Sequence, residues 1–201
     1  LVYDSVHGKI YATANYWVRR FFVYDIATDV WSEETLDPPP TTPGTGAALV
    51  FDGARYIYYL RGGGNQTFAR FDTDPTTPSG SRWGNLGNTP AGVNYGTDMV
   101  YKGGYIYTLR GGSTPGFYRY APSIPAWNDA VVTDLPTGVN VYRDGFLVDI
   151  GPDTLMACRG ENTTTCYTYS IAANAWTALD NAKVNIYSGG AAASNGTDKV
   201  S

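Results

Sequence analysis

The sequence is poor in the side chains that most often carry catalytic chemistry. Its 201 residues include one histidine, His7, and two cysteines, Cys158 and Cys166. A serine or cysteine nucleophile usually needs a nearby base such as histidine, and transition-metal sites usually draw on several histidines or cysteines. Asp72-Thr73-Asp74 offers an incomplete set of calcium ligands. We therefore expect no catalytic residue, no cofactor and no metal site.

Long apolar runs and runs of basic residues are also missing. No stretch approaches the roughly 18 consecutive apolar residues of a membrane span, and the first residues lack the charged-then-apolar pattern of a signal peptide. Only 16% of the residues are charged and the net charge is -4, whereas a nucleic-acid-binding domain concentrates Lys and Arg. We expect no membrane span and no nucleic-acid partner.

What the sequence has in quantity is turn-forming and aromatic residues. It contains 24 Gly and 12 Pro, together with 17 Tyr, 7 Phe and 5 Trp. Glycine and proline form turns, and aromatic side chains suit the half-buried surface of a pleated sheet. This composition predicts an all-β protein.

An internal repeat organises the whole chain. Five similar segments are centred on residues 10, 57, 106, 155 and 200, at intervals of 47, 49, 49 and 45 residues. A fixed period of about 20 to 50 residues marks solenoids, propellers or arrays. Four strands of about five or six residues and their turns fill such a unit. The segments are Lys9-Ile10-Tyr11, Tyr56-Ile57-Tyr58, Tyr105-Ile106-Tyr107, Thr154-Leu155-Met156 and Lys199-Val200-Ser201.

Each unit predicts four strands in a fixed order. A small-residue or apolar strand such as 46–51 comes first, and a Gly-bearing turn leads to the Ile-Tyr strand. That second strand typically closes on Arg-Gly, an aromatic third strand follows, and the fourth strand carries a tryptophan. The tryptophans of this series are Trp31, Trp83, Trp127 and Trp176, and Trp17 falls outside it.

These residues resemble the Kelch repeat, in which an Ile-Tyr strand closes on Gly-Gly and is followed by an aromatic-Tyr-Asp strand and a spaced Trp. The segment Tyr24-Asp25-Ile26-Ala27-Thr28-Asp29-Val30-Trp31 matches best. Three departures are Ala14-Asn15-Tyr16 and Gly160-Glu161 in place of the Gly pair, and Tyr169-Ser170 in place of Tyr-Asp. The resemblance implies a β-propeller of four-stranded antiparallel blades.

We therefore predict one all-β domain over residues 1–201, with about four complete blades and a partial fifth. The blades span approximately 1–40, 41–90, 91–138 and 139–183, and the partial blade spans 184–201. A four-stranded sheet cannot bury two apolar faces alone, so the Trp and Phe side chains should pack between neighbouring blades. The aromatic stripe is thus interpreted as core.

The predicted series of blades is interrupted within a blade at both ends of the sequence. The first unit begins inside its first strand, and the last unit stops inside its second. Because exposed sheet edges pair with other chains, two readings stay open. Either these residues are part of a larger propeller of five or more blades, or the hairpin at 190–201 meets a neighbouring copy and the protein self-assembles through its terminal part-blade.

The two cysteines occupy facing positions of one predicted hairpin. Cys158 and Cys166 replace the apolar pairs Leu60 with Phe68 and Leu109 with Phe117 of the other units. Facing strand positions bring two cysteines within disulfide distance. We predict a disulfide, which favours an extracellular or cell-surface location; two free, buried thiols are the alternative.

Three sequons and one basic ring complete the candidate sites. The sequons begin at Asn65, Asn162 and Asn195 and predict N-glycosylation, while asparagine as a plain turn residue is the alternative. Arginines recur at the end of the second strand and asparagines recur before the first. A ring of these residues suits a carbohydrate or a protein surface, or it has a repeated structural role. The ring consists of Arg61, Arg110, Arg159, Asn94, Asn140 and Asn185.

The leading functional hypothesis is a non-catalytic extracellular β-propeller that acts as a structural or binding module, either alone or as a subunit or repeat of a surface fibre. One alternative is the accessory propeller of a secreted carbohydrate-active enzyme. The other is an intracellular Kelch adaptor, which the cysteine pair and the sequons disfavour.

Overall fold

The computed structural model describes residues 1–14, 18–186 and 190–192, and within them the chain forms strands and no helix. In this described part of the chain, sixteen strands build four antiparallel sheets of four strands each. No helix in the described part of the chain has the length and apolar character needed to cross a membrane. Trp17, Asn195, the segment 199–201 and most of the predicted part-blade lie outside the described residues.

The sheets follow one another along the chain. Sheet 1 contains β1 (Val2–Asp4), β2 (Lys9–Thr13), β3 (Phe21–Asp25) and β4 (Val30–Glu33). Sheet 2 contains β5 (Ala48–Phe51), β6 (Tyr56–Leu60), β7 (Phe68–Asp72) and β8 (Trp83–Asn85). Sheet 3 contains β9 (Asp98–Lys102), β10 (Tyr105–Leu109), β11 (Phe117–Ala121) and β12 (Ala126–Trp127). Sheet 4 contains β13 (Phe146–Gly151), β14 (Thr154–Cys158), β15 (Cys166–Ser170) and β16 (Ala175–Ala178). Each sheet lies inside one of the four predicted blade ranges.

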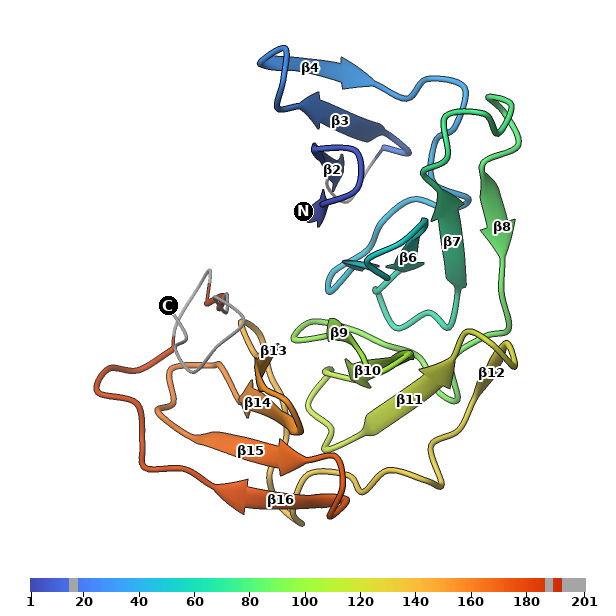
Figure 1. The fold of residues 1–201 in the computed structure, drawn as a ribbon. Coiled ribbons are helices and arrows are strands. Elements are labelled where there is room, and N and C mark those ends of the chain that lie inside the picture. The colour runs from blue at the N-terminus through green and yellow to red at the C-terminus, as the bar shows by residue number, and fades with distance from the viewer. Residues whose placement is uncertain (15–17, 187–189, 193–201) are drawn as a thin grey trace.

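The four sheets stand around a common centre, with the first strand of each sheet innermost and the last outermost (Figure 1). The first strands together line one central cavity of about 590 Å³, to which residues of β1, β5, β9 and β13 all contribute. This arrangement is compatible with a propeller-like fold, with sheets 1 and 4 at the two ends of the series.

The same aromatic contact joins each sheet to the next. A phenylalanine of one sheet meets the tryptophan of the following sheet, with ring centroids 5.3, 4.8 and 5.0 Å apart at the three junctions. Edge-to-face rings at this distance stabilise a core beyond their buried area. The pairs are Phe21 with Trp83, Phe68 with Trp127, and Phe117 with Trp176. The prediction that the tryptophans pack between neighbouring sheets is confirmed for three of the four.

Each of the three tryptophans also fixes the connection that leaves the preceding sheet. Its indole Nε1 donates a hydrogen bond to a main-chain carbonyl of that connection, at 2.9 Å for Trp83 to Asp37, 3.0 Å for Trp127 to Gly87 and 2.8 Å for Trp176 to Thr133. A buried indole N–H needs such an acceptor. The junction is therefore specified by polar as well as apolar contacts.

The position after the second strand requires glycine for a steric reason. Gly111 has a φ of 64°, in the left-handed region that glycine tolerates best. A Cβ at this position would lie 2.2 Å from the carbonyl oxygen of Tyr95. The turn between the second and third strands therefore packs against the connection entering the same sheet, and only glycine allows the approach.

Candidate functional site

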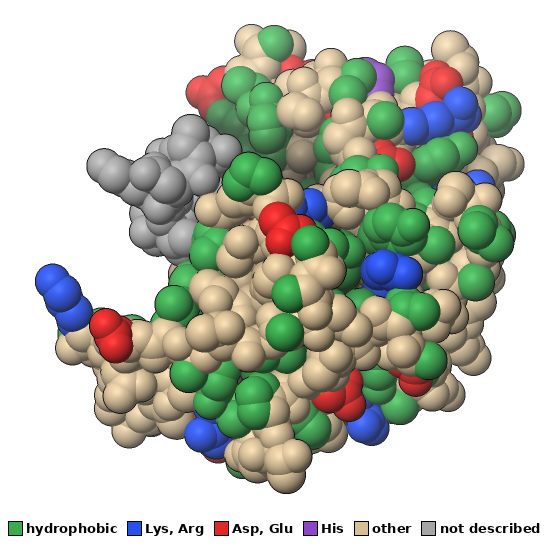
Figure 2. All heavy atoms as spheres, turned by 60° about the horizontal axis from the view of Figure 1, so that its bottom comes forward, with side chains coloured by type: hydrophobic (Ala, Val, Ile, Leu, Met, Phe, Trp, Pro, Cys, Tyr) green, Lys and Arg blue, Asp and Glu red, His purple; other side chains and the backbone are tan. Residues whose placement is uncertain are grey.

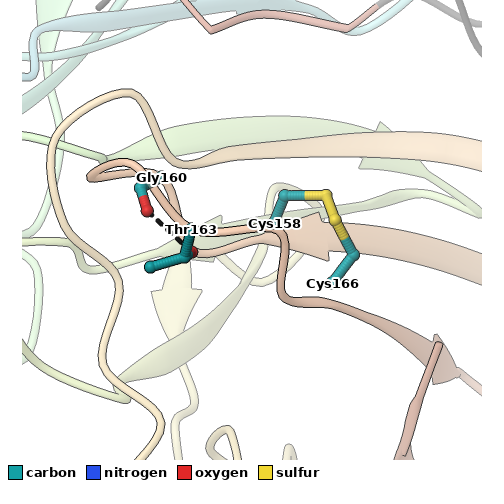
Figure 3. Close-up of a disulfide and its surroundings, with 4 residues drawn as sticks. All are labelled: Cys158, Gly160, Thr163 and Cys166. Atoms are coloured by element: carbon teal, nitrogen blue, oxygen red, sulfur yellow. Dashed lines mark hydrogen bonds between the residues drawn. A yellow bond between two sulfur atoms is a disulfide. The ribbon is translucent and has the colours of Figure 1, made fainter. Parts of the chain in front are cut away.

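Cys158 and Cys166 form a disulfide across the β14–β15 hairpin (Figure 3). They are directly opposite in the strand register and their Cα atoms are 4.1 Å apart, close to the spacing of a non-hydrogen-bonded antiparallel pair. Both residues are buried. The predicted pairing is present in the structure, and the bond closes the turn 159–165 covalently.

The sequons Asn65 and Asn162 lie in corresponding turns between second and third strands, but one position apart. Asn65 forms a β-bridge with Val93, whereas in sheet 4 the matching bridge to Ile186 is made by Thr163. Asn162 has a φ of 60° and is exposed, and Asn65 accepts hydrogen bonds from the amide and hydroxyl of Thr67. Both asparagines thus also stabilise their turns. Asn195 lies outside the described residues.

Two of the three ring arginines hold the connection that enters their sheet. The Nε of Arg110 donates to the carbonyl of Gly92 at 3.1 Å, and the Nε of Arg159 donates to the carbonyl of Asn140 at 3.0 Å. The Arg159 guanidinium also lies 5.1 Å from the centroid of the Tyr142 ring. Arg61 holds the entering connection through its backbone, because its main-chain carbonyl accepts a hydrogen bond from the amide of Gly44. These contacts give the arginines a repeated structural role.

The ring asparagines do not all occupy one repeated position. The bridges of Val93, Val141 and Ile186 align the three connections, which makes Asn140 equivalent to Asn185 and places Asn94 two positions later. Asn94 accepts the amide of Tyr95, and the Asn185 side chain donates to that of Asn162. The expected equivalence of the three asparagines is wrong for Asn94, because sequence alignment alone did not detect the two-residue shift.

A polar pocket of about 530 Å³ lies beside Arg110 on sheet 3. Gly116 carries no side chain there, and a Cβ would lie 3.0 Å from the Arg110 Cδ. Burial raises the pKa of the Tyr118 hydroxyl; Arg110 lowers it, while Asp134 and Asp129 raise it. The pocket therefore combines a guanidinium, a phenol and two carboxylates. Its lining comprises Arg110, Pro115, Gly116, Tyr118, Asp129, Ala130, Val132 and Asp134.

Asp98 lines the central cavity and joins two of its inner strands. Asp98 accepts the amides of Met99 at 2.8 Å and Leu147 at 2.9 Å, so it ties β9 to β13. Burial raises its pKa to about 6, although these two amides oppose the shift. Nearby, the Lys102 Nζ lies 2.6 Å from the Asp149 carboxylate.

The other polar residues considered from sequence contact charged side chains close to them. The His7 Nδ1 lies 2.7 Å from the buried carboxylate of Asp4. Although burial raises the pKa of Asp72, bonds from Arg55 help to lower it to about 2. Asp72 and Asp74 both face Arg55, which makes their pair part of a salt-bridge network.

The charged side chains are dispersed over the face seen in Figure 2, without a continuous field of one sign. Within residues 1–14, 18–186 and 190–192, no group of three or more His, Cys, Asp or Glu side chains is arranged to hold a metal ion.

An apolar hollow beside the disulfide was not predicted. It measures about 550 Å³ and is lined by Phe146, Met156, Cys158, Cys166, Leu179, Asp180, Ala182, Val184, Asn185, Ile186, Gly190 and Ala191. The sequence does contain a signal for it. Met156 and Cys166 stand where sheet 3 has Tyr107 and Phe117, and these smaller side chains leave space.

Comparisons with known proteins identify a fold and no family. No family model matches the chain, and no curated protein matches it. Among solved structures 209 chains match. One of them, titled "Structure of YjhT", aligns with a TM-score of 0.74 over 96% of this chain and 69% of its own, at 15% sequence identity. A likeness at this identity concerns the fold alone.

Proposed function

We propose that this chain is a Kelch-like β-propeller region that acts as a non-catalytic, extracellular structural or binding module. The observation that carries the proposal is the sheet-to-sheet junction, which recurs three times with the same aromatic pair and the same indole hydrogen bond. Each junction uses side chains of both sheets, so every sheet needs neighbours, as the blades of a propeller do. The four sheets correspond to four blades.

The extracellular location is supported by the disulfide. Structural disulfides persist in oxidising compartments and are rare in the cytosol. Cys158 and Cys166 are the only cysteines of the sequence, and in the structure they bond to each other. Attached glycans at Asn65 and Asn162 belong to the same proposal, because both residues lie in turns between strands and Asn162 is exposed.

Carbohydrate is the ligand class that best fits the pocket beside Arg110. Hydroxyl groups can donate to the carboxylates of Asp129 and Asp134 and accept from the guanidinium and the phenol of Tyr118. Its volume falls within the range of about 300 to 1,000 Å³ usual for small-ligand pockets. This pocket equally suits the accessory propeller of a secreted carbohydrate-active enzyme, whose catalytic residues would lie elsewhere.

Two measurements test the proposal. Protein secreted from eukaryotic cells is alkylated before reduction, and its intact mass is recorded with and without a glycosidase; we expect no alkylated cysteine and a mass loss that Asn65→Gln and Asn162→Gln diminish. An oligosaccharide array then compares the wild type with Asp129→Asn, and we expect weaker binding by the variant. Alkylation of both cysteines in the native protein would contradict the extracellular assignment, and an array without any bound sugar would contradict carbohydrate as the ligand.

A further inference from the structure

A small pocket lies between sheets 3 and 4, at the edge opposite the pocket beside Arg110. It measures about 330 Å³. Sheet 3 contributes the turn between β9 and β10, two tyrosines of β10 and Arg119 of β11, and sheet 4 contributes the turn between β13 and β14. The pocket therefore has one wall from each of two consecutive sheets.

Arg119 brings a positive charge to this pocket. Its guanidinium lies 4.4 Å from the centroid of the Tyr105 ring, and among the described residues no carboxylate lies within ion-pair distance of it. Burial raises the pKa of the neighbouring Tyr107 hydroxyl, and Arg119 opposes that shift. An arginine stacked on a ring keeps the N–H groups at its edge for a planar acceptor such as a carboxylate.

The other charged side chains that line the pocket are held by partners outside it. Asp153 accepts the hydroxyl of Ser170 at 2.8 Å and the amide of Ala172 at 2.9 Å, one on each carboxylate oxygen. The Lys102 Nζ lies 2.6 Å from the Asp149 carboxylate, so that it joins sheet 3 to sheet 4. The aspartate oxygens can each accept a further hydrogen bond, and the ammonium group has two further N–H groups. Both side chains can therefore bind the hydroxyls of a ligand.

The junction of sheets 2 and 3 has an equivalent arginine without these partners. Arg70 corresponds to Arg119, because each lies opposite the second tyrosine of its second strand. The Arg70 guanidinium also lies over a tyrosine ring, 4.2 Å from the centroid of Tyr56. Stacking on tyrosine is thus common to both junctions, whereas the lysine and the aspartate belong only to the pocket between sheets 3 and 4. The replacements are Asp52 for Lys102 and Gly104 for Asp153.

We propose that the pocket between sheets 3 and 4 binds a hydroxylated carboxylate, such as a uronic acid residue of a carbohydrate. Arg119 forms two parallel hydrogen bonds with the carboxylate, and the ligand hydroxyls donate to Asp153 and accept from Lys102. A neutral sugar has no charge to offer the guanidinium, so the pocket selects the acidic sugar. Its volume is at the low end of the range of about 300 to 1,000 Å³ for small-ligand pockets, which suits a single sugar ring. The inference deepens the proposed carbohydrate binding and rests on it.

Matched variants test the pocket with defined probes. Binding of methyl glucuronide is measured by isothermal titration calorimetry, with methyl glucoside as the neutral analogue and sodium acetate as the bare carboxylate. Arg119→Gln removes the charge in the pocket, and Arg70→Gln removes the equivalent charge at the junction of sheets 2 and 3. Each substitution also removes one cation–π contact, so the two variants share any general effect on packing. Circular dichroism first establishes that each variant is folded. Should Arg119→Gln not fold, Arg119→Lys keeps the charge and removes only the planar fork.

We expect the wild type and Arg70→Gln to bind methyl glucuronide equally well. Arg119→Gln should bind it about 10- to 100-fold more weakly, as usual when hydrogen bonds to a charged group are lost, and Arg119→Lys should lie between the two. Methyl glucoside and acetate should both bind the wild type more weakly than the glucuronide does.

Four results would overturn the inference: a wild type that does not bind the glucuronide, a glucoside that binds as tightly, an acetate that binds as tightly, or an equal loss in Arg70→Gln and Arg119→Gln. Sugars on the array whose binding Asp129→Asn weakens would, in each case, leave the proposed function standing.

Discussion

The hairpins β10–β11 and β14–β15 have the same register but different means of stabilisation. Leu109 lies opposite Phe117 in the first hairpin, and Cys158 lies opposite Cys166 in the second. Phe117 packs against Tyr169 and Trp176 of the next sheet, whereas the two cysteines bond to each other beside a hollow. The comparison teaches that the face packed against the next sheet uses large aromatic side chains, whereas the face beside the hollow uses a covalent link between small ones.

The largest effect should come from removing a large side chain of the face that packs against the next sheet. Phe117→Ala should lower the free energy of unfolding by about 3 to 5 kcal/mol, because it removes a fully buried ring and leaves a cavity. Urea denaturation followed by tryptophan fluorescence measures the loss. Phe22→Ala is the matched control on a partly exposed strand position, and an equal loss in both variants would contradict the packing role of Phe117.

The inner strands offer a second test, through the pH dependence of stability. The pKa of Asp98 is about 6 in the folded protein and 3.8 without the fold, so the folded state keeps a proton that the unfolded state releases between these values. The free energy of unfolding should therefore fall as the pH rises from about 4 to about 6, by at most about 3 kcal/mol. In Asp98→Asn this contribution should be absent. Denaturation curves with the same pH slope in both proteins would refute the assignment.

Removing the covalent link tests the other hairpin. The double variant Cys158→Ala, Cys166→Ala should have a free energy of unfolding that is lower by roughly 2 kcal/mol. The loss is modest because the loop that the disulfide closes is short. Thermal unfolding is measured with and without reductant. Reductant should destabilise the wild type and leave the variant unchanged; a wild type that is insensitive after complete reduction would show that the bond contributes nothing.

The smallest expected effect concerns single hydrogen bonds. Trp176→Phe keeps an aromatic ring but loses the 2.8 Å bond from Nε1 to Thr133, which should cost about 1 kcal/mol. Trp31→Phe should cost nearly nothing in dilute, monomeric protein, because Trp31 is 53% exposed. Chemical denaturation of both variants provides the comparison, and equal losses would mean that the indole bonds do not distinguish the junctions.

Local patterns were sufficient to predict much of the fold. The Ile-Tyr segments, the aromatic third strands and the tryptophans predicted the order of strands in each sheet, because side-chain alternation and turn glycines act over a few residues. The cysteine pair was predictable for the same reason, since Cys158 and Cys166 flank one turn. The prediction that the tryptophans pack between neighbouring sheets failed at Trp31, which is 53% exposed, because such packing depends on a neighbouring sheet and not on the residue's own unit.

The candidate sites depended on features that a repeat alignment does not contain. Asn94 is two positions away from the equivalent of Asn140, because the connections between sheets have different lengths and conformations. The pocket beside Arg110 requires Asp129 and Asp134 from such a connection. The hollow beside the disulfide depends on the missing volume of Met156 and Cys166. Each of these features arises from packing between segments far apart in the sequence.

The Cys158–Cys166 bond also changes what a protease could accomplish. The peptide bonds of the turn 159–165 lie between the two bonded residues, so a cut there would leave both pieces on one molecule. A cut in the corresponding turn of sheet 3, between Leu109 and Phe117, would leave the fragments joined only by noncovalent contacts. Proteolytic nicking at the turn of sheet 4 would thus stay invisible on a denaturing gel until a thiol was added.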